Sequence, residues 1–242
     1  MSVLAAVPLS QLLSWGDKGF GDELAYGALM SVQIALFGYA IGAGLGLLGA
    51  VGKLSGPPWL RRTLNVYTTI IRAAPELVLI MLLYYAGTAG FNAFIGLLGF
   101  SGIQLNGVIA AILVLGFVQS AYHTEVLRAA IEAVPIGQTE AALAFGMGPW
   151  ARFRRITLPA MLPNAIPGLA NLWLNITKDS ALVSVVGTTE LALATQQAAG
   201  ASKQYFVLSL VAALIYLVIS LFSTTGFAAL ERYVRRGQRS LA

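Results

Sequence analysis

Five apolar stretches, each long enough to cross a lipid bilayer, leave this chain few ways to fold in water. A transmembrane helix needs roughly 20 mostly apolar residues. Of the 242 residues, 57% are hydrophobic and only 10% are charged, whereas a soluble domain carries roughly 25% charged residues. We therefore predict an all-α membrane protein with about five transmembrane helices. These cover about residues 24–51, 65–88, 107–131, 160–187 and 204–230.

The basic residues between the apolar stretches indicate how the chain crosses the membrane. Linkers rich in Lys and Arg mark the cytoplasmic side, and here they alternate with linkers that carry no net basic charge. An odd number of spans places the two termini on opposite sides, so we predict an N-terminus outside and a C-terminus inside. The residues that mark the inner side are Lys53, Arg61, Arg62, Arg152, Arg154, Arg155, Arg232, Arg235, Arg236 and Arg239.

The same features divide the chain into three segments. Residues 1–23 lack the basic start and unbroken apolar core of a signal peptide. We interpret them as a periplasmic segment in which Val3–Leu13 lies along the membrane interface. Residues 24–231 are predicted to form the transmembrane domain, with a cytoplasmic loop at 132–159, and residues 232–242 a basic cytoplasmic tail.

The composition excludes several kinds of site. The chain has no cysteine and one histidine, His123, which excludes thiolate and histidine-rich metal centres. It contains no P-loop pattern and no Ser, His and Asp set that would indicate an enzyme. The net charge of +5 follows from topology and does not indicate nucleic-acid binding. We expect no catalytic residue, metal or cofactor in this chain, so energy must come from another chain or an ion gradient.

Polar residues in the third span recur every three or four residues and therefore share one helix face. Charged groups at membrane depth cost about 2.5–3.5 kcal/mol on insertion scales, so they face protein or water. Such a face either bonds helices together or lines a substrate route. Here we favour helix association, because Glu125 and Arg128 lie near the inner end and can pair. The face consists of Gln119, Tyr122, Glu125, Arg128 and Glu132.

A second polar stripe follows the fourth span, again at steps of three and four residues. For this stripe both alternatives stay open: it either associates helices or lines a substrate route. Its members are Asn164, Gly168, Asn171, Asn175 and Lys178, with Asp179 beside the last.

Small residues in the first span and a proline in the second affect helix packing. Glycines at helical spacing let helices approach closely, and we predict that they serve packing. His123 is interpreted as a hydrogen-bonded structural residue. Pro75 stands between Arg72 and Glu76 and removes a backbone hydrogen bond, which predicts a kink. The kink either shapes the helix alone or lines a route between two halves. The glycines are Gly42, Gly46, Gly49 and Gly52.

The cytoplasmic loop carries the most distinctive pattern of the chain. Glu140-Ala-Ala is followed four positions later by Gly146 and, after nine more residues, by Ile156-Thr-Leu-Pro159. This pattern resembles the coupling loop of bacterial ABC-importer permeases, which an ATPase moves. The resemblance implies coupling roles for Glu140, Ala141, Ala142 and Gly146. Gly146 would supply a tight turn, and Glu140 would cap or salt-link the loop.

Further stretches narrow the resemblance to one branch of these permeases. The stretches are Thr69–Leu79, Ala121–Ala142 and Ile156–Ser184. Together they resemble the polar-amino-acid group, specifically the Q-type membrane subunit of histidine, basic-amino-acid and opine uptake systems. The similarity extends over nearly everything after residue 20.

The resemblance implies a type I ABC-importer permease in the bacterial inner membrane that takes substrate from a periplasmic binding protein. Its implied partners are a second permease subunit, an ABC ATPase dimer and membrane lipids. The candidate residues of a substrate path come from the polar stripes and the proline kink, under the alternative in which these line a route: Pro75, Gln119, Tyr122, Asn171, Asn175, Lys178 and Asp179.

One position departs from the pattern of the relatives. Many of them carry Glu six residues before the position of Lys178, where this chain has Leu172. Leu cannot pair with a cationic substrate, so we expect a non-identical partner permease to supply the acid. The alternative is a different substrate for which no acid is needed. The alternative function is a gradient-driven secondary transporter or channel that works alone.

Overall fold

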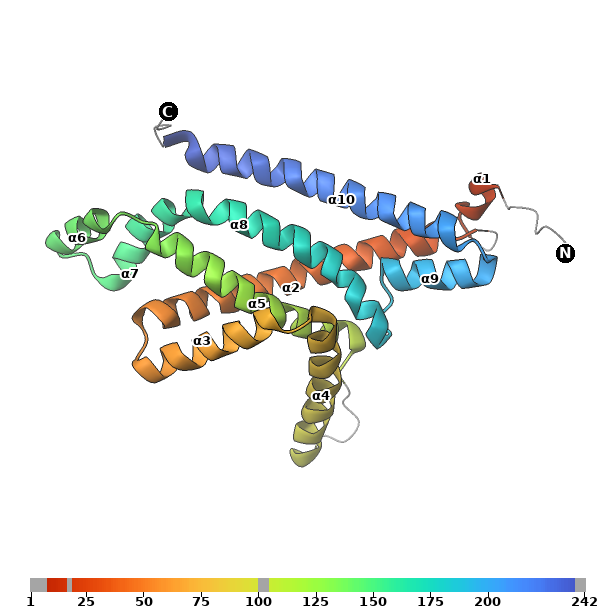
Figure 1. The fold of residues 1–242 in the computed structure, drawn as a ribbon, viewed down its shortest axis with the longest axis horizontal. Coiled ribbons are helices and arrows are strands. Elements are labelled where there is room, and N and C mark those ends of the chain that lie inside the picture. Colours follow the sequence, from red (N-terminus) through yellow and green to blue (C-terminus); the bar gives the residue numbers. More distant parts are fainter. Residues whose placement is uncertain (1–7, 17–18, 100–104, 238–242) are drawn as a thin grey trace. The chain divides into compact units, whose positions relative to one another are not determined.

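The computed structural model describes residues 8–16, 19–99 and 105–237, so the start of the expected Val3–Leu13 segment lies outside the described residues. Every regular element in these ranges is a helix, which confirms the predicted all-α fold (Figure 1). The elements are α1 (Leu9–Leu12), α2 (Gly21–Ser55), α3 (Pro58–Ala73), α4 (Glu76–Leu97), α5 (Gly107–Glu132), α6 (Ile136–Ala144), α7 (Pro149–Arg152), the π-helix η1 (Phe153–Thr157), α8 (Leu158–Asp179), the 3-10 helix η2 (Ser180–Val186), α9 (Leu191–Ser202), α10 (Tyr205–Val234) and η3 (Arg235–Gly237).

Within the described residues, four helices are long and apolar enough to cross a membrane: α2, α4, α5 and α10. The fourth expected span, 160–187, contains α8, which is not among these four. Its 22 residues reach about 33 Å at 1.5 Å per residue, enough for a hydrocarbon core of about 30 Å. What α8 lacks is hydropathy, because the polar stripe that ends at Lys178 occupies one of its faces.

Pro75 separates two helices rather than kinking one. α3 ends at Ala73 and α4 begins at Glu76, with Ala74 in an extended conformation at ψ 149°. A residue before proline avoids the helical region, and proline itself has no N–H to donate. The expectation of one continuous span over 65–88 is therefore wrong: its first part lies in α3 and the remainder in α4.

The chain divides into two compact units, which are described separately. Unit 1 comprises residues 1–38, 77–115 and 176–220, and unit 2 comprises residues 39–76, 116–175 and 221–242. Five helices contribute residues to both units: α2, α5, α8 and α10, and α4 through its first residue, Glu76, alone.

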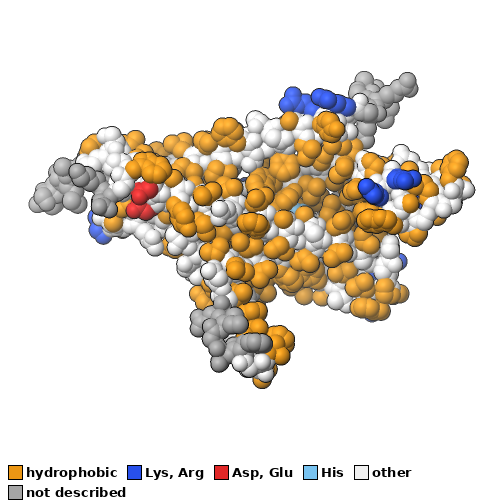
Figure 2. All heavy atoms as spheres, turned by 180° about the vertical axis from the view of Figure 1, so that it is seen from behind, with side chains coloured by type: hydrophobic (Ala, Val, Ile, Leu, Met, Phe, Trp, Pro, Cys, Tyr) orange, Lys and Arg blue, Asp and Glu red, His pale blue; other side chains and the backbone are white. Residues whose placement is uncertain are grey.

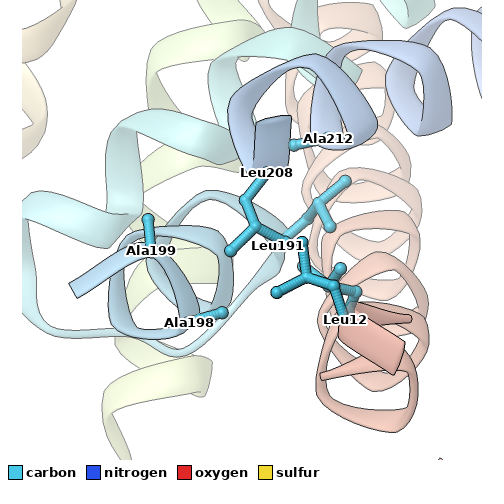
Figure 3. Packing of buried hydrophobic residues seen from close by; sticks show 7 residues of the cluster. Leu12, Leu191, Ala198, Ala199, Leu208 and Ala212 are labelled. Carbon is cyan, nitrogen blue, oxygen red and sulfur yellow. The ribbon is translucent and has the colours of Figure 1, made fainter. Parts of the chain in front are cut away.

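The core of unit 1 joins α1, α2, α9 and α10. Leu191, the first residue of α9, is fully buried, and Leu208 of α10 packs in the same cluster (Figure 3). Small side chains on α9 reduce the distance at which neighbouring helices can pack. The cluster consists of Leu12, Leu24, Leu191, Ala198, Ala199, Leu208 and Ala212.

In unit 2 the glycines of α2 lie against α5. A Cβ added at Gly46 would overlap the side chain and backbone of His123, and one at Gly49 would overlap Thr124. Gly42 faces Gln119 and His123 less tightly, with a Cβ 3.2–3.3 Å from them, and Gly52 packs against Leu64 of α3 instead. The predicted packing role is thus confirmed most clearly for Gly46 and Gly49, where only a residue without a side chain permits the observed approach to α5.

Hydrophobic side chains cover most of the face of the molecule shown in Figure 2. The most apolar stretches of α4 and α10 are each only 11% buried. Phe222 on α10 and Leu97 at the end of α4 are 76% and 87% exposed. In water such a surface would cause aggregation, whereas against lipid or another membrane subunit it is favourable.

Candidate functional site

The loop between α5 and α8 begins with α6. Pro135 occupies the N-cap position of α6, and no side chain caps this helix. Glu140 and Ala141 are exposed, while Ala142 is 4% exposed. Glu140 makes no ion pair or side-chain hydrogen bond with any residue of the described ranges. The expected cap or salt link from Glu140 is therefore wrong, and its carboxylate is available to a partner.

Gly146 terminates α6 in a left-handed conformation with φ +71°. Its N–H donates to the carbonyl of Leu143 at 2.9 Å, and the N–H of Met147 donates to that of Ala142 at 3.0 Å. These two bonds form a Schellman motif, which favours glycine at the left-handed position. The predicted tight turn at Gly146 is confirmed. No neighbouring atom would obstruct a Cβ there, so the backbone conformation alone requires glycine.

Large apolar side chains project from this loop. Ile136 and Leu143, seven residues apart on α6, are 75% and 53% exposed, and Phe145 is 87% exposed. Trp150 on α7 is 71% exposed and stacks on Phe153 at a centroid distance of 6.0 Å. Large exposed apolar groups that gather on one segment mark an interaction surface.

The Ile156–Pro159 part of the sequence pattern marks the junction with α8. Residues Phe153–Thr157 form a π-helix, and α8 starts at Leu158. A single π-helical turn inside a helix occurs often at functional sites. Arg154 and Arg155 on this turn are exposed.

A charged network in unit 2 joins the ends of α2, α3 and α5. The ammonium group of Lys53 lies 2.5 Å from Glu125 Oε1 and donates to Thr68 Oγ1 at 2.6 Å. Glu125 Oε2 in turn lies 3.1 Å from Arg128 Nε, and Arg128 Nη1 lies 2.7 Å from Glu132 Oε2. The predicted pairing of Glu125 with Arg128 is confirmed. The sequence marks Lys53 only as a topology signal and does not predict its place in this network.

The N-terminal part of the α5 polar face packs within unit 2. His123 is fully buried, its Nδ1–H donates to the carbonyl of Gln119 at 2.9 Å, and its ring meets Tyr39 edge-on at 4.7 Å. This agrees with a structural histidine. Gln119 is 2% exposed. The guanidinium of Arg72, just before Pro75, lies 5.9 Å from the centre of the Tyr122 ring, close enough for a cation–π contact.

The polar stripe of α8 lies on its exposed side. Asn164, Asn171 and Lys178, each seven residues apart, are all exposed. Asn175 and Asp179 are half-buried. Leu172, by contrast, is 5% exposed and belongs to the interior of unit 2. A membrane helix does not turn amides and an ammonium group toward lipid. This face of α8 therefore faces water or another subunit.

The predicted path residues do not gather in one unit. Pro75, Gln119, Tyr122, Asn171 and Asn175 belong to unit 2. Lys178 and Asp179, on the last turn of α8, belong to unit 1.

Sequence reasoning also missed a buried carboxylate in unit 1. Glu190 is fully buried and caps α9, with Oε1 accepting from the N–H of Leu193 at 2.9 Å. Its Oε2 accepts from Ser31 Oγ at 2.9 Å and from the Tyr216 hydroxyl at 2.8 Å. Glu190 thereby joins α2, α9 and α10. Glutamate is not a preferred N-cap residue, so the sequence alone indicated only a linker charge.

In the described residues, two helices with polar stripes, α5 and α8, are joined by a loop that exposes large apolar side chains. Residues 24–236 match the family of binding-protein-dependent transport system inner membrane components, and the chain belongs to this family. It is thus a transmembrane permease component of an ABC importer in the inner membrane, as the coupling-loop pattern predicted.

Individual relatives cover nearly the whole chain. The nopaline transport system permease protein NocQ of Agrobacterium fabrum is 43% identical over 231 residues, 95% of this chain and 98% of that protein. The histidine/lysine/arginine/ornithine transport system permease protein HisQ of Salmonella typhimurium is 39% identical over 214 residues, 88% of this chain and 94% of that protein. The crystal structure of an amino acid ABC transporter with histidines matches with a TM-score of 0.74 and 29% identity, over 88% of this chain and 95% of that chain.

Proposed function

We propose that this permease imports a basic amino acid or an opine, delivered by a periplasmic binding protein and driven by a separate ATPase. The names of the similar permeases, which transport nopaline or histidine, lysine, arginine and ornithine, support this substrate class. The N-terminus lies outside and the C-terminus inside. In this orientation residues 1–23 are periplasmic, the loop at 132–159 is cytoplasmic, and residues 232–242 form a basic cytoplasmic tail.

The observation that carries the proposal is the apolar tip of the cytoplasmic loop. Phe145 and Trp150 are 87% and 71% exposed, although the loop projects into water rather than lipid in the proposed orientation. An ATPase subunit that covers these side chains removes their apolar surface from water. Ala141 allows close approach along α6, and the exposed Glu140 offers a charge to a basic ATPase group.

Alternating access then needs no chemistry in this chain. ATP and the loaded binding protein each bind one conformation of the complex more tightly than the other, and their differential affinities shift the population. The exposed polar face of α8 supplies the route along which the substrate passes. Energy comes from ATP hydrolysis in the separate chain.

Co-expression with an ATPase, a partner permease and a binding protein of the same source tests the proposal. The permease should co-purify with an ATPase, and reconstituted vesicles should accumulate substrate only with internal ATP and loaded binding protein. A panel of labelled histidine, lysine, arginine, ornithine, nopaline and octopine identifies the cargo. Accumulation driven by an ion gradient in the absence of the ATPase would contradict the proposal.

The partner permease is non-identical in this proposal. The position where many relatives carry an acid is Leu172, which is 5% exposed. At this position the chain therefore has no carboxylate that could pair with a cationic substrate. The acid belongs to the partner, and Asn171 and Asn175 contribute neutral hydrogen bonds of about 0.5–1.5 kcal/mol each.

Asn175→Ala should therefore reduce uptake moderately, by about 2- to 12-fold at about 0.5–1.5 kcal/mol. Removal of the partner's acid should nearly abolish uptake of cationic substrates. The measurements are uptake rates at equal membrane levels and the subunit masses of the intact complex. A functional complex with two copies of this chain would show that the proposed asymmetry is wrong.

A further inference from the structure

A cleft in unit 1, with several polar side chains in a mostly apolar lining, lies outside all residues assigned so far. It has a volume of about 420 Å³. It is bounded by α2, α4, the start of α5 and the turn that follows η2. Its polar lining consists of Tyr26, Tyr84, Asn106, Thr188 and Thr189.

Thr188 is the first indication of a ligand. Its side chain is 4% exposed, and its hydroxyl has no hydrogen-bond partner in the described part of the chain. Buried hydroxyls are almost always paired. The backbone fixes this group in place, because Gly187 adopts φ +81° and the N–H of Thr188 donates to the carbonyl of Val183 at 3.3 Å. The unpaired hydroxyl can therefore bond to a group that is not part of this chain.

The start of α5 is the second component of the cleft. Asn106 Oδ1 accepts from the N–H of Val108 at 2.8 Å and caps the helix. This bond engages the amide oxygen and leaves the side-chain NH₂ group of Asn106 as a donor. α5 is 26 residues long, and the N-terminus of a long helix presents free N–H groups and a partial positive charge. Such an end favours an anionic group.

Tyr84 supplies a third donor. Its hydroxyl lies directly against the start of α5, since a Cβ at Gly107 would come within 3.1 Å of it. Its hydroxyl has no hydrogen bond to a residue of the described ranges. Glycine at position 107 thus leaves room for the phenol beside the helix end.

All of these groups can donate a hydrogen bond, and the cleft has no carboxylate in its described lining. Asp22 and Glu23 precede Tyr26 on α2 by one turn but do not line the cleft. Converging neutral donors at a helix N-terminus suit a carboxylate rather than a cation. Tyr26 and Met30 add an apolar wall for the stem of the ligand.

We propose that this cleft binds the carboxylate of the transported amino acid or opine, through Tyr84, Thr188, Asn106 and the N-terminus of α5. The assignment rests on the proposed function, because the ligand is its cargo. In the proposed orientation the cleft lies toward the outer side, where the binding protein releases the substrate. This cleft is a separate binding site from the polar face of α8.

The test uses the complete purified complex without ATP and measures equilibrium binding of free labelled ligands. The probes are arginine, histidine and lysine, each beside the amine that lacks its carboxylate (agmatine, histamine and cadaverine), together with nopaline. Thr188→Val and Tyr84→Phe remove one hydroxyl each and keep the shape. The matched control is Tyr85→Phe, because Tyr85 is 56% exposed and does not line the cleft.

At least one carboxylate ligand should bind the wild-type complex more tightly than its amine counterpart. The double variant Tyr84→Phe, Thr188→Val should raise the Kd of that ligand about 100-fold or more, as expected for two lost hydrogen bonds to a charged group. Tyr85→Phe should leave the Kd unchanged, and the affinity for the amines should not respond to any variant. Asn106→Asp keeps the helix cap but replaces a donor with a negative charge, so it should weaken carboxylate binding further.

Equal affinities for acid and amine, or an unchanged Kd in the double variant, would overturn the assignment of the cleft. ATP-dependent uptake by the wild-type complex is measured in parallel. Normal uptake with an unaffected Kd refutes the cleft alone, whereas absence of ATP-dependent uptake for every probe refutes the proposed function.

Discussion

At the scale of single residues, Gly146 and Lys53 occupy positions that few other residue types can fill. Gly146 combines a left-handed backbone with a place between the exposed Phe145 and the rest of the loop. The ammonium group of Lys53 is held by a carboxylate and a hydroxyl from two other helices. One residue fixes the direction of the loop, and the other fixes the helix ends from which the loop projects.

Gly146→Asp should leave membrane insertion intact but reduce coupled uptake about tenfold. An L-residue with a left-handed backbone costs about 1–2 kcal/mol, and the new charge adjoins the apolar contact surface. The measurements are membrane level, uptake and the ATPase rate stimulated by loaded binding protein.

The control for this prediction is Gly148→Ala. Gly148 has φ −64°, and a Cβ there would meet no neighbouring atom. This variant should behave like wild type. Equal activity of the two variants would refute the role assigned to the turn at Gly146.

Lys53→Met should destabilise the protein strongly, because Glu125 keeps its charge with a side chain only 19% exposed. Breaking a buried pair by removing one partner costs about 3–5 kcal/mol, and the remaining contact of Glu125 with Arg128 places this variant at the lower end. Arg62→Met is the control, since Arg62 is exposed. Thermal unfolding in detergent measures both. A melting temperature as high as that of Arg62→Met would contradict a structural role for the network.

At the scale of elements, the sequence predicted helices well and their ends poorly. Apolar length alone located α2, α5 and α10, since little else in a chain produces so long a stretch of mostly apolar residues. The break at Pro75 was predicted only as a kink. Whether a proline bends or ends a helix depends on which neighbours can satisfy the freed backbone groups, and these are tertiary contacts.

In the candidate site, too, features with a local cause were predicted and features that depend on tertiary contacts were not. The Schellman turn was predicted because glycine has a local conformational reason to stand at position 146. The partners of Lys53 and Glu190 were not, because each lies more than 15 residues from at least one residue that contacts it. No periodicity in the sequence connects Glu190 with Ser31, which is 159 residues away.

Gly46→Ala should weaken the packing of α2 on α5. The added methyl group would overlap the side chain and backbone of His123, and overpacking of this kind costs about 1–3 kcal/mol. Gly44→Ala is the matched control on the same helix, where a Cβ meets no atom within 4 Å. We expect a lower melting temperature for the first variant only. Equal melting temperatures would show that α5 can move aside freely.

At the scale of the whole molecule, the prediction concerns how the chain is threaded through the bilayer. A periplasm-active reporter should work when fused after residue 98 or 203 and fail after residue 57, 148 or 240. The reason is the alternation of basic residues between the linkers. Reporter activity in truncated fusions measures the orientation. The inverse pattern would refute the orientation, and a mixed pattern would refute the number of crossings.

The length of α2 makes the transporter sensitive to the thickness of the surrounding bilayer. Its apolar part, residues 24–51, extends about 42 Å at 1.5 Å per residue, well beyond a hydrocarbon core of about 30 Å. A helix with such an excess tilts, or thickens the lipid around it, at a cost that grows with every ångström of mismatch. The tilt of α2 is therefore set partly by the acyl chains of the host membrane, and lipids of different chain length should change the working rate of the transporter without any change in its sequence.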